Sequence, residues 1–214
     1  MPAWYAELDE AERWEAQARF WGAIAERVGA SPAIFAYDLM NEPVVPGEPT
    51  TDWLPGEPFG GFSYVQNVTR DPAGRSWQEV MRAWIRRLTA AIREHDRAHL
   101  VTVGFLPFAS YAELAGELDH LSVHVYPRRG EVDASLELLE ALGEGGRPVV
   151  VEETFHLESG IGDLRDFLVR SRERDLAAGW IGFYGGTPPA ELDPNDIGDA
   201  LLGQWLALFS ELRP

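Results

Sequence analysis

The chain has 214 residues and a net charge of -17, and it contains no cysteine and no lysine. The negative charge argues against nucleic acid or an anionic membrane surface as a partner, and no apolar run approaches the roughly 18 residues of a membrane span. The missing cysteine and lysine exclude disulfides, thiolate nucleophiles, cysteine-bound metals, Schiff bases and the lysine of phosphate loops.

Helices and strands are predicted to alternate along the chain. Residues 1–29 have apolar side chains at helical spacing, and they lack the basic and apolar regions of a secretory signal. The predicted strands are 33–40, 99–105, 120–126, 147–155 and 180–186, and the later helices are about 76–95, 109–117, 132–142, 163–178 and 196–212. The strands are rich in Val and Ile with little polar alternation, which predicts a parallel sheet covered by helices.

Parallel strands joined by helices form either an open doubly wound sheet or a closed barrel. The open sheet usually binds a nucleotide through a G-x-G-x-x-G turn or a phosphate loop, and neither motif is present in the sequence. A (β/α)8 barrel instead gathers polar residues at the C-terminal ends of several strands. Three predicted strands end in such residues, so the barrel is favoured.

The first of these strand ends is in "FAYDLMNEPV", residues 35–44. Side chains alternate along a strand, so Asp38 and Glu42 should share the face that looks toward the barrel axis. Pro43 cannot extend a strand and is expected to end it. The sequence therefore predicts that Asn41 and Glu42 lie at the rim of the barrel.

The other two strand ends carry a histidine, a tyrosine and a pair of glutamates. In "HLSVHVYP", His124 and Tyr126 share a face, and in "RPVVVEETF" Glu152 and Glu153 follow three valines. Alternation alone does not separate the two glutamates. Two carboxylates from two strands at one rim are the groups that glycoside hydrolysis requires, one as acid/base and the other as nucleophile.

These three motifs together resemble glycoside hydrolase family 5, the cellulase-like enzymes of clan A. The resemblance implies a retaining mechanism with a covalent glycosyl-enzyme and with no cofactor and no metal. It implies that Glu42 is the acid/base and that Asn41 binds the sugar 2-hydroxyl. By alignment of the last glutamate before an aromatic residue, it implies that Glu153 is the nucleophile, and Glu152 then has a supporting role. It also implies that His124 binds substrate and that Tyr126 orients the nucleophile.

Aromatic residues offer candidate sugar platforms. The family commonly ends its eighth strand in Trp, and here Tyr184 or Trp180 would have to serve. The predicted loop 43–75 is long, and such loops are usually functional or disordered. Its aromatic residues, with Trp53 as the first candidate, either form a subsite wall or pack on one another as a lid. They are Trp53, Phe59, Phe62 and Tyr64.

If 33–40 matches the family's fourth strand, the first three strand units have no counterpart in the sequence. Residues 1–214 are therefore predicted to be one domain with strands four to eight of the barrel, acting on an oligosaccharide or polysaccharide. One alternative is an inactive fragment or carbohydrate-binding remnant, whose two open sheet edges favour self-association. Another alternative is a metal-dependent sugar isomerase with four possible ligands, namely Asp38, Glu42, His124 and Glu153.

Overall fold

The computed structural model describes residues 1–58 and 61–212, which form two compact units. Unit 1 comprises Met1–Phe105 and Glu113–Leu121, and unit 2 comprises Leu106–Ala112 and the residues from Ser122 onward. The prediction that the chain is a single partial-barrel domain stays a prediction.

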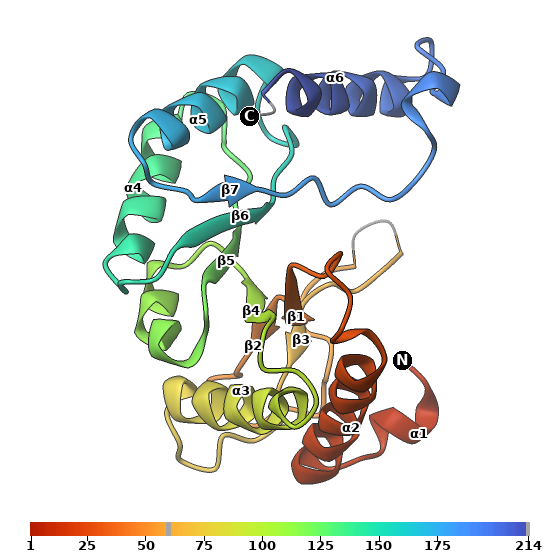
Figure 1. The fold of residues 1–214 in the computed structure, drawn as a ribbon, viewed down its shortest axis with the longest axis vertical. Helices are drawn as coiled ribbons and strands as arrows, with labels where there is room; N and C mark the ends of the chain where they lie inside the picture. The colour runs from red at the N-terminus through yellow and green to blue at the C-terminus, as the bar shows by residue number, and fades with distance from the viewer. Residues whose placement is uncertain (59–60, 213–214) are drawn as a thin grey trace. The chain divides into compact units, whose positions relative to one another are not determined.

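Figure 1 labels the helices and strands along the chain. The first seven are α1 (Ala3–Ala6), α2 (Glu10–Val28), β1 (Ala36–Asn41), β2 (Pro43–Val44), β3 (Gln66–Asn67), α3 (Trp77–Arg93) and β4 (Leu100–Phe105). The next five are the 3-10 helix η1 (Ala109–Glu117), β5 (Leu121–His124), α4 (Val132–Gly143), β6 (Val149–Glu153) and α5 (Ile161–Glu173). The chain then forms β7 (Gly179–Trp180), the 3-10 helix η2 (Pro189–Glu191) and α6 (Ile197–Glu211).

The five main strands form one sheet in the order β1-β4-β5-β6-β7, and β2 pairs with β3 separately. The pairs β1/β4 and β6/β7 are parallel, as expected for strands that are joined by helices. The predicted fold class, parallel strands covered by helices, is confirmed. In the part of the chain that the structure describes, no helix is long and apolar enough to cross a membrane.

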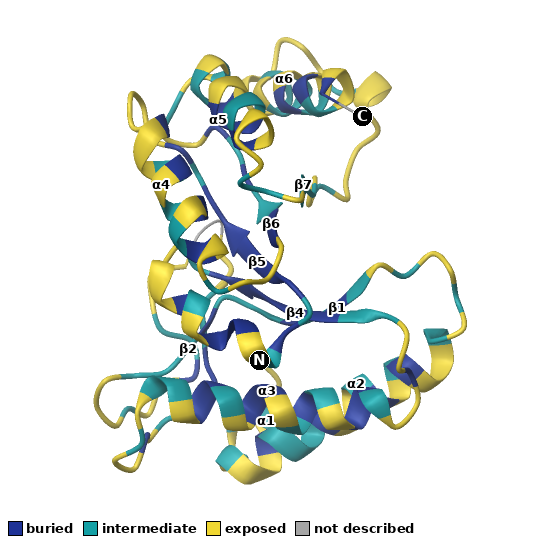
Figure 2. Cartoon of the chain, turned by 60° about the vertical axis from the view of Figure 1, so that its left-hand side comes forward, coloured by how far each residue is buried: buried dark blue, intermediate teal, exposed yellow. Residues whose placement is uncertain are grey.

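Two long helices of unit 1 begin where the sequence offers a capping box. Asp9 with Glu12 caps α2, and Ser76 with Glu79 caps α3, so that backbone N–H groups at each helix start have acceptors. The apolar stripe of α3 is buried, as Figure 2 shows. Its members Val80, Met81, Trp84, Ile85 and Leu88 are each at most 1% exposed. Each such side chain contributes about 1.5–3 kcal/mol through burial, so packing against α2 stabilises α3.

Helix α2 also bonds to the segment that contains the predicted site residues. The indole Nε1 of Trp21 donates to the Leu39 carbonyl at 3.2 Å, and that of Trp14 donates to the Val68 carbonyl at 2.7 Å. Trp21 additionally packs edge-on against Tyr37, with ring centroids 6.0 Å apart. These contacts hold both ends of the segment between Leu39 and Val68 against one helix.

The N-terminal end of β1 is fixed by a buried carboxylate. Asp96, 3% exposed, accepts hydrogen bonds of 2.6 Å from the Tyr37 hydroxyl and 2.8 Å from the Ala98 amide, and the His99 ring lies 2.6 Å from it. Burial and the bond to Asp96 raise the pKa of Tyr37 to about 12. The hydroxyl therefore stays protonated and bonded at any ordinary pH.

Two predicted strand boundaries are wrong. Pro43 does not end β1, which already stops at Asn41; it begins β2, whose partner is β3. The last strand, predicted over 180–186, is only Gly179–Trp180. Glycines at 182, 185 and 186 weaken strand structure, and β7 is the last strand in the sheet order, so its outer side lacks a neighbouring strand within the described residues.

Candidate active site

In unit 1, the predicted site residues Asn41 and Glu42 follow a β-bulge. The register of β1 against β4 shifts between Asp38 and Asn41, which adds one residue to β1. The Asp38 carboxylate supports the bulge, because its Oδ1 accepts from the Gly104 amide at 2.7 Å and from the Met40 amide at 3.3 Å. The extra residue interrupts the simple alternation of side chains between Asp38 and Glu42, and the shared face of these two side chains stays a prediction.

Glu42 has a left-handed backbone, with φ at 45°. A residue with a side chain rarely adopts this conformation, and such residues concentrate at functional sites. Two backbone bonds hold it: the Glu42 amide donates to the Gly104 carbonyl at 2.8 Å, and the Glu42 carbonyl accepts from the Gln66 amide at 3.2 Å. Next to it, the Asn41 side-chain amide donates to the Tyr64 carbonyl at 3.2 Å.

In unit 2, the structure brings Glu153, His124 and Tyr126 together. The Tyr126 hydroxyl donates a hydrogen bond to Oε1 of Glu153. Nδ1 of His124 lies 3.3 Å from Oε2 of Glu153, and His124 is only 2% exposed. The Val125 amide donates to the Glu153 carbonyl at 2.9 Å, which aligns the ends of β5 and β6. Both carboxylate oxygens of Glu153 thus have neighbours that can fix its orientation.

Glu152 has a different environment from Glu153. Its Oε2 is buried and has no hydrogen-bond partner among the described residues. Burial raises the pKa of Glu152, a shift that His124 and Ser122 oppose and that Glu153 increases. Glu152 is therefore suited to hold a proton, whereas Glu153 is held by two neighbours as an acceptor. The sequence did not reveal this difference, because strand alternation only places adjacent side chains on opposite faces and does not describe the environment of either one.

Replacing Glu152 with Gln should reduce the loss of stability between acid and neutral pH. The pKa of Glu152 is raised in the folded state, so its contribution is fully present below the unfolded value of about 4.3 and is lost as pH rises through the folded value. Gln does not ionise and cannot show this loss. Urea denaturation of wild type and E152Q at about pH 4 and about pH 7 measures it. Equal pH dependence in the two proteins would contradict the raised pKa.

Trp53, the first candidate for a sugar platform in the loop, is packed inside unit 1. It is 5% exposed, and its Nε1 donates to the Ala6 carbonyl at 3.1 Å. The guanidinium groups of Arg13 and Arg70 lie over the ring, 3.8 Å and 4.7 Å from a ring centroid. A ring with so little exposed surface offers no platform to a sugar. Of the other loop aromatics, Phe59 lies outside the described residues.

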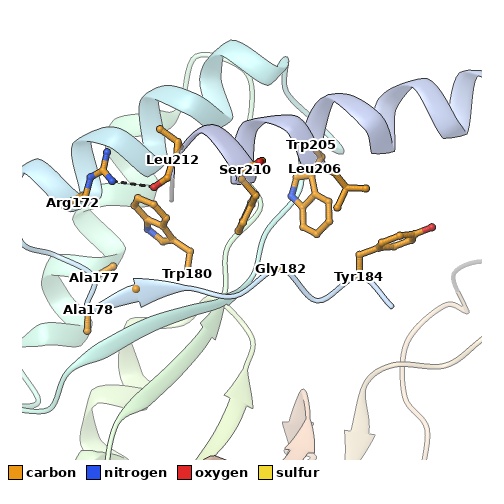
Figure 3. A pocket seen from close by; sticks show the side chains of 12 residues that line it. Arg172, Ala177, Ala178, Trp180, Gly182, Tyr184, Trp205, Leu206, Ser210 and Leu212 are labelled. Carbon is orange, nitrogen blue, oxygen red and sulfur yellow. Dashed lines mark hydrogen bonds between the residues drawn. The ribbon is translucent and has the colours of Figure 1, made fainter. Parts of the chain in front are cut away.

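Trp180 and Tyr184 line a cavity of about 540 Å³ between the β7 segment and α6 (Figure 3). The Trp180 indole donates to Ser171 of α5 at 3.1 Å, and the Tyr184 hydroxyl donates to the Thr187 carbonyl at 3.2 Å. Neither Glu153 nor its two neighbours line this cavity. This cavity therefore does not join the two predicted platforms to Glu153, and the role of Trp180 and Tyr184 as sugar platforms stays a prediction.

Within the described residues, no group of three or more His, Asp and Glu side chains could hold a metal ion. The candidate catalytic residues lie in both units, with Asn41 and Glu42 in unit 1 and His124, Tyr126 and Glu153 in unit 2.

Comparison with known families identifies the chain. A family model described as cellulase, glycosyl hydrolase family 5, matches residues 2–134, which is more than half of the sequence. The chain belongs to glycosyl hydrolase family 5. The match to family 5 includes the strand ends with Asn41, Glu42, His124 and Tyr126 and stops before Glu153.

Solved structures show the same fold as this family 5 chain. It is similar to a calcium-binding mutant of β-glucuronidase 2 from Bacteroides uniformis, with 16% identity, a TM-score of 0.56, and coverage of 79% of this chain and 21% of that one. It is also similar to endo-glycoceramidase II from Rhodococcus sp., with 22% identity, a TM-score of 0.52, and coverage of 82% and 40%. The chain thus spans between a fifth and two fifths of the length of these proteins. A search of curated proteins found no match.

Proposed function

We propose that this family 5 chain supplies the catalytic residues of a retaining glycoside hydrolase that cleaves a β-linked glycan or glycoside. The observation that carries the proposal is the environment of Glu153, whose two carboxylate oxygens lie against the Tyr126 hydroxyl and His124 Nδ1. A nucleophilic carboxylate has to present one oxygen to the anomeric carbon in a fixed direction, and two neighbours that restrict its rotation favour this.

In the first step, Glu153 attacks the anomeric carbon and forms an ester bond as the glycosidic bond breaks. Glu42, at its bulged strand end, gives its proton to the departing oxygen. Asn41 binds the sugar 2-hydroxyl, where hydrogen bonds strengthen as the ring approaches an oxocarbenium-like transition state. The step requires Glu42 protonated and Glu153 ionised.

In the second step, Glu42 takes a proton from water, whose oxygen attacks the anomeric carbon and releases Glu153 as a carboxylate. The Tyr126 hydroxyl donates to that carboxylate and stabilises the charge that returns to it. Glu42 thus acts first as an acid and then as a base, and Glu153 acts first as the nucleophile and then as the leaving group. The sugar leaves with its original configuration. This arrangement requires the two carboxyl groups to be about 5–5.5 Å apart in the working enzyme.

The configuration of the first product tests the proposal. We expect proton NMR of a fresh reaction with an aryl β-glycoside panel to show the β-anomer before mutarotation. An α-anomer would contradict the retaining mechanism. The alternative of an inactive remnant predicts no hydrolysis and no covalent labelling by a slow glycosyl fluoride substrate.

A further inference from the structure

Two aromatic side chains in the loop between β2 and β3 are exposed to solvent. Phe62 is 68% exposed and Tyr64 is 47% exposed, in contrast to the buried Trp53 of the same loop. Large aromatic groups usually gain stability by burial, and each can bury about 150–250 Å². Folding therefore leaves apolar surface at this place.

The end of this loop, at Tyr64 and Gln66, is fixed to the candidate catalytic strand end. The Asn41 side chain donates to the Tyr64 carbonyl at 3.2 Å, and the Gln66 amide donates to the Glu42 carbonyl at 3.2 Å. Strand β3 then begins at Gln66, opposite Pro43 of β2. Tyr64 is thus placed by direct contact with the residue that precedes the proposed acid/base.

We propose that Phe62 and Tyr64 form an aromatic wall that binds a further sugar ring of the substrate, next to the ring at the cleavage point. This inference rests on the proposed function, because it takes Asn41 and Glu42 as substrate-contacting residues. Pyranose rings have an apolar face of C–H groups, which packs against an aromatic face, while their hydroxyls remain in water. The substrate class is then an oligosaccharide or polysaccharide, and a simple monosaccharide glycoside would leave the wall empty.

Binding to variants of the full chain tests the wall separately from catalysis. The background is Glu153→Gln, so that glycans are not consumed, and the probes are β-linked glucose, mannose, xylose and galactose sugars, each from monomer to tetramer. Calorimetry compares Tyr64→Ala and Phe62→Ala with Tyr64→Phe, which keeps the ring. None of the three removes a backbone carbonyl, so Asn41 keeps its acceptor. Phe20→Ala on α2 is the matched control, since Phe20 is also exposed, at 57%.

We expect at least one oligomer series to bind more tightly than its monomer, and Tyr64→Ala to weaken the preferred oligomer about 10-fold without affecting the monomer. Tyr64→Phe and Phe20→Ala should bind as the background does. Oligomers that bind no better than monomers, or a loss that is equal for both, would overturn the wall. Hydrolysis without a wall effect removes only this inference, and a wall effect without hydrolysis in the wild-type chain removes only the proposed function.

Discussion

Replacing Glu153 with Gln should abolish hydrolysis of aryl β-glycosides, with a fall in kcat of about 10⁴-fold or more. The amide is close in size to the carboxylate and can stay near Tyr126, so the fold should be retained. The amide is too weak a nucleophile to form the glycosyl-enzyme, and without this intermediate the second step cannot occur. Initial rates and circular dichroism of the purified variant measure the two expectations.

Glu152→Gln is the matched control for this experiment, because it makes the same chemical change one residue earlier. It should keep most of the activity, since its Oε2 is buried and burial raises its pKa, which disfavours the carboxylate form that could attack a sugar. A 2-deoxy-2-fluoro glycoside should label the wild type on Glu153, which peptide mass spectrometry can locate. A label on Glu152, or wild-type turnover in Glu153→Gln, would refute the assignment.

Replacing Glu42 with Gln should lower activity by an amount that depends on the leaving group. A positioned general acid contributes about 10²–10⁴-fold, and this contribution is needed when the departing oxygen is a poor leaving group. Nitrophenolate can depart without a proton, so cleavage of the glycosidic bond in nitrophenyl glycosides should be almost unaffected. Hydrolysis of the glycosyl-enzyme should then become rate-limiting. A burst of nitrophenol followed by slow turnover is the expected trace.

The control is Glu48→Gln, which changes an exposed carboxylate in the same loop. It should leave rates unchanged for every leaving group. If Glu42→Gln slowed nitrophenyl and alkyl glycosides equally, with no burst, the residue would be acting on binding or folding, and the acid/base role would have to be given up.

The alternation of strand and helix could be predicted because each element has a strong local pattern. In α3, the stripe from Val80 to Leu88 follows the helical period, and Ser76 with Glu79 marks the start. The adjacency of His124 and Tyr126 to Glu153 was also expected, but only through the family resemblance. Periodicity places side chains on a face and does not say which two strands are neighbours.

The parts that could not be predicted depend on contacts between distant residues. The bulge in β1 is supported by the hydrogen bond from the Gly104 amide to the Asp38 carboxylate, and no local sequence pattern predicts this contact. Trp53 was a candidate sugar platform because its loop is long and has several aromatic residues, yet it is 5% exposed and its ring contacts Arg13 and Arg70. The contacts of these two arginines with Trp53 arise from tertiary packing, and the sequence does not indicate which aromatic ring a given arginine will contact.

The two indole bonds of α2 bear on how the protein can be shortened. Trp21 and Trp14 donate hydrogen bonds to backbone carbonyls on either side of the stretch that contains Asn41, Glu42 and Tyr64. The helix itself contributes no candidate catalytic group. Trimming the protein from its N-terminus past Trp14 would release one end of that stretch and leave the other attached. A minimal version meant for crystallisation or engineering therefore has to keep the whole of α2.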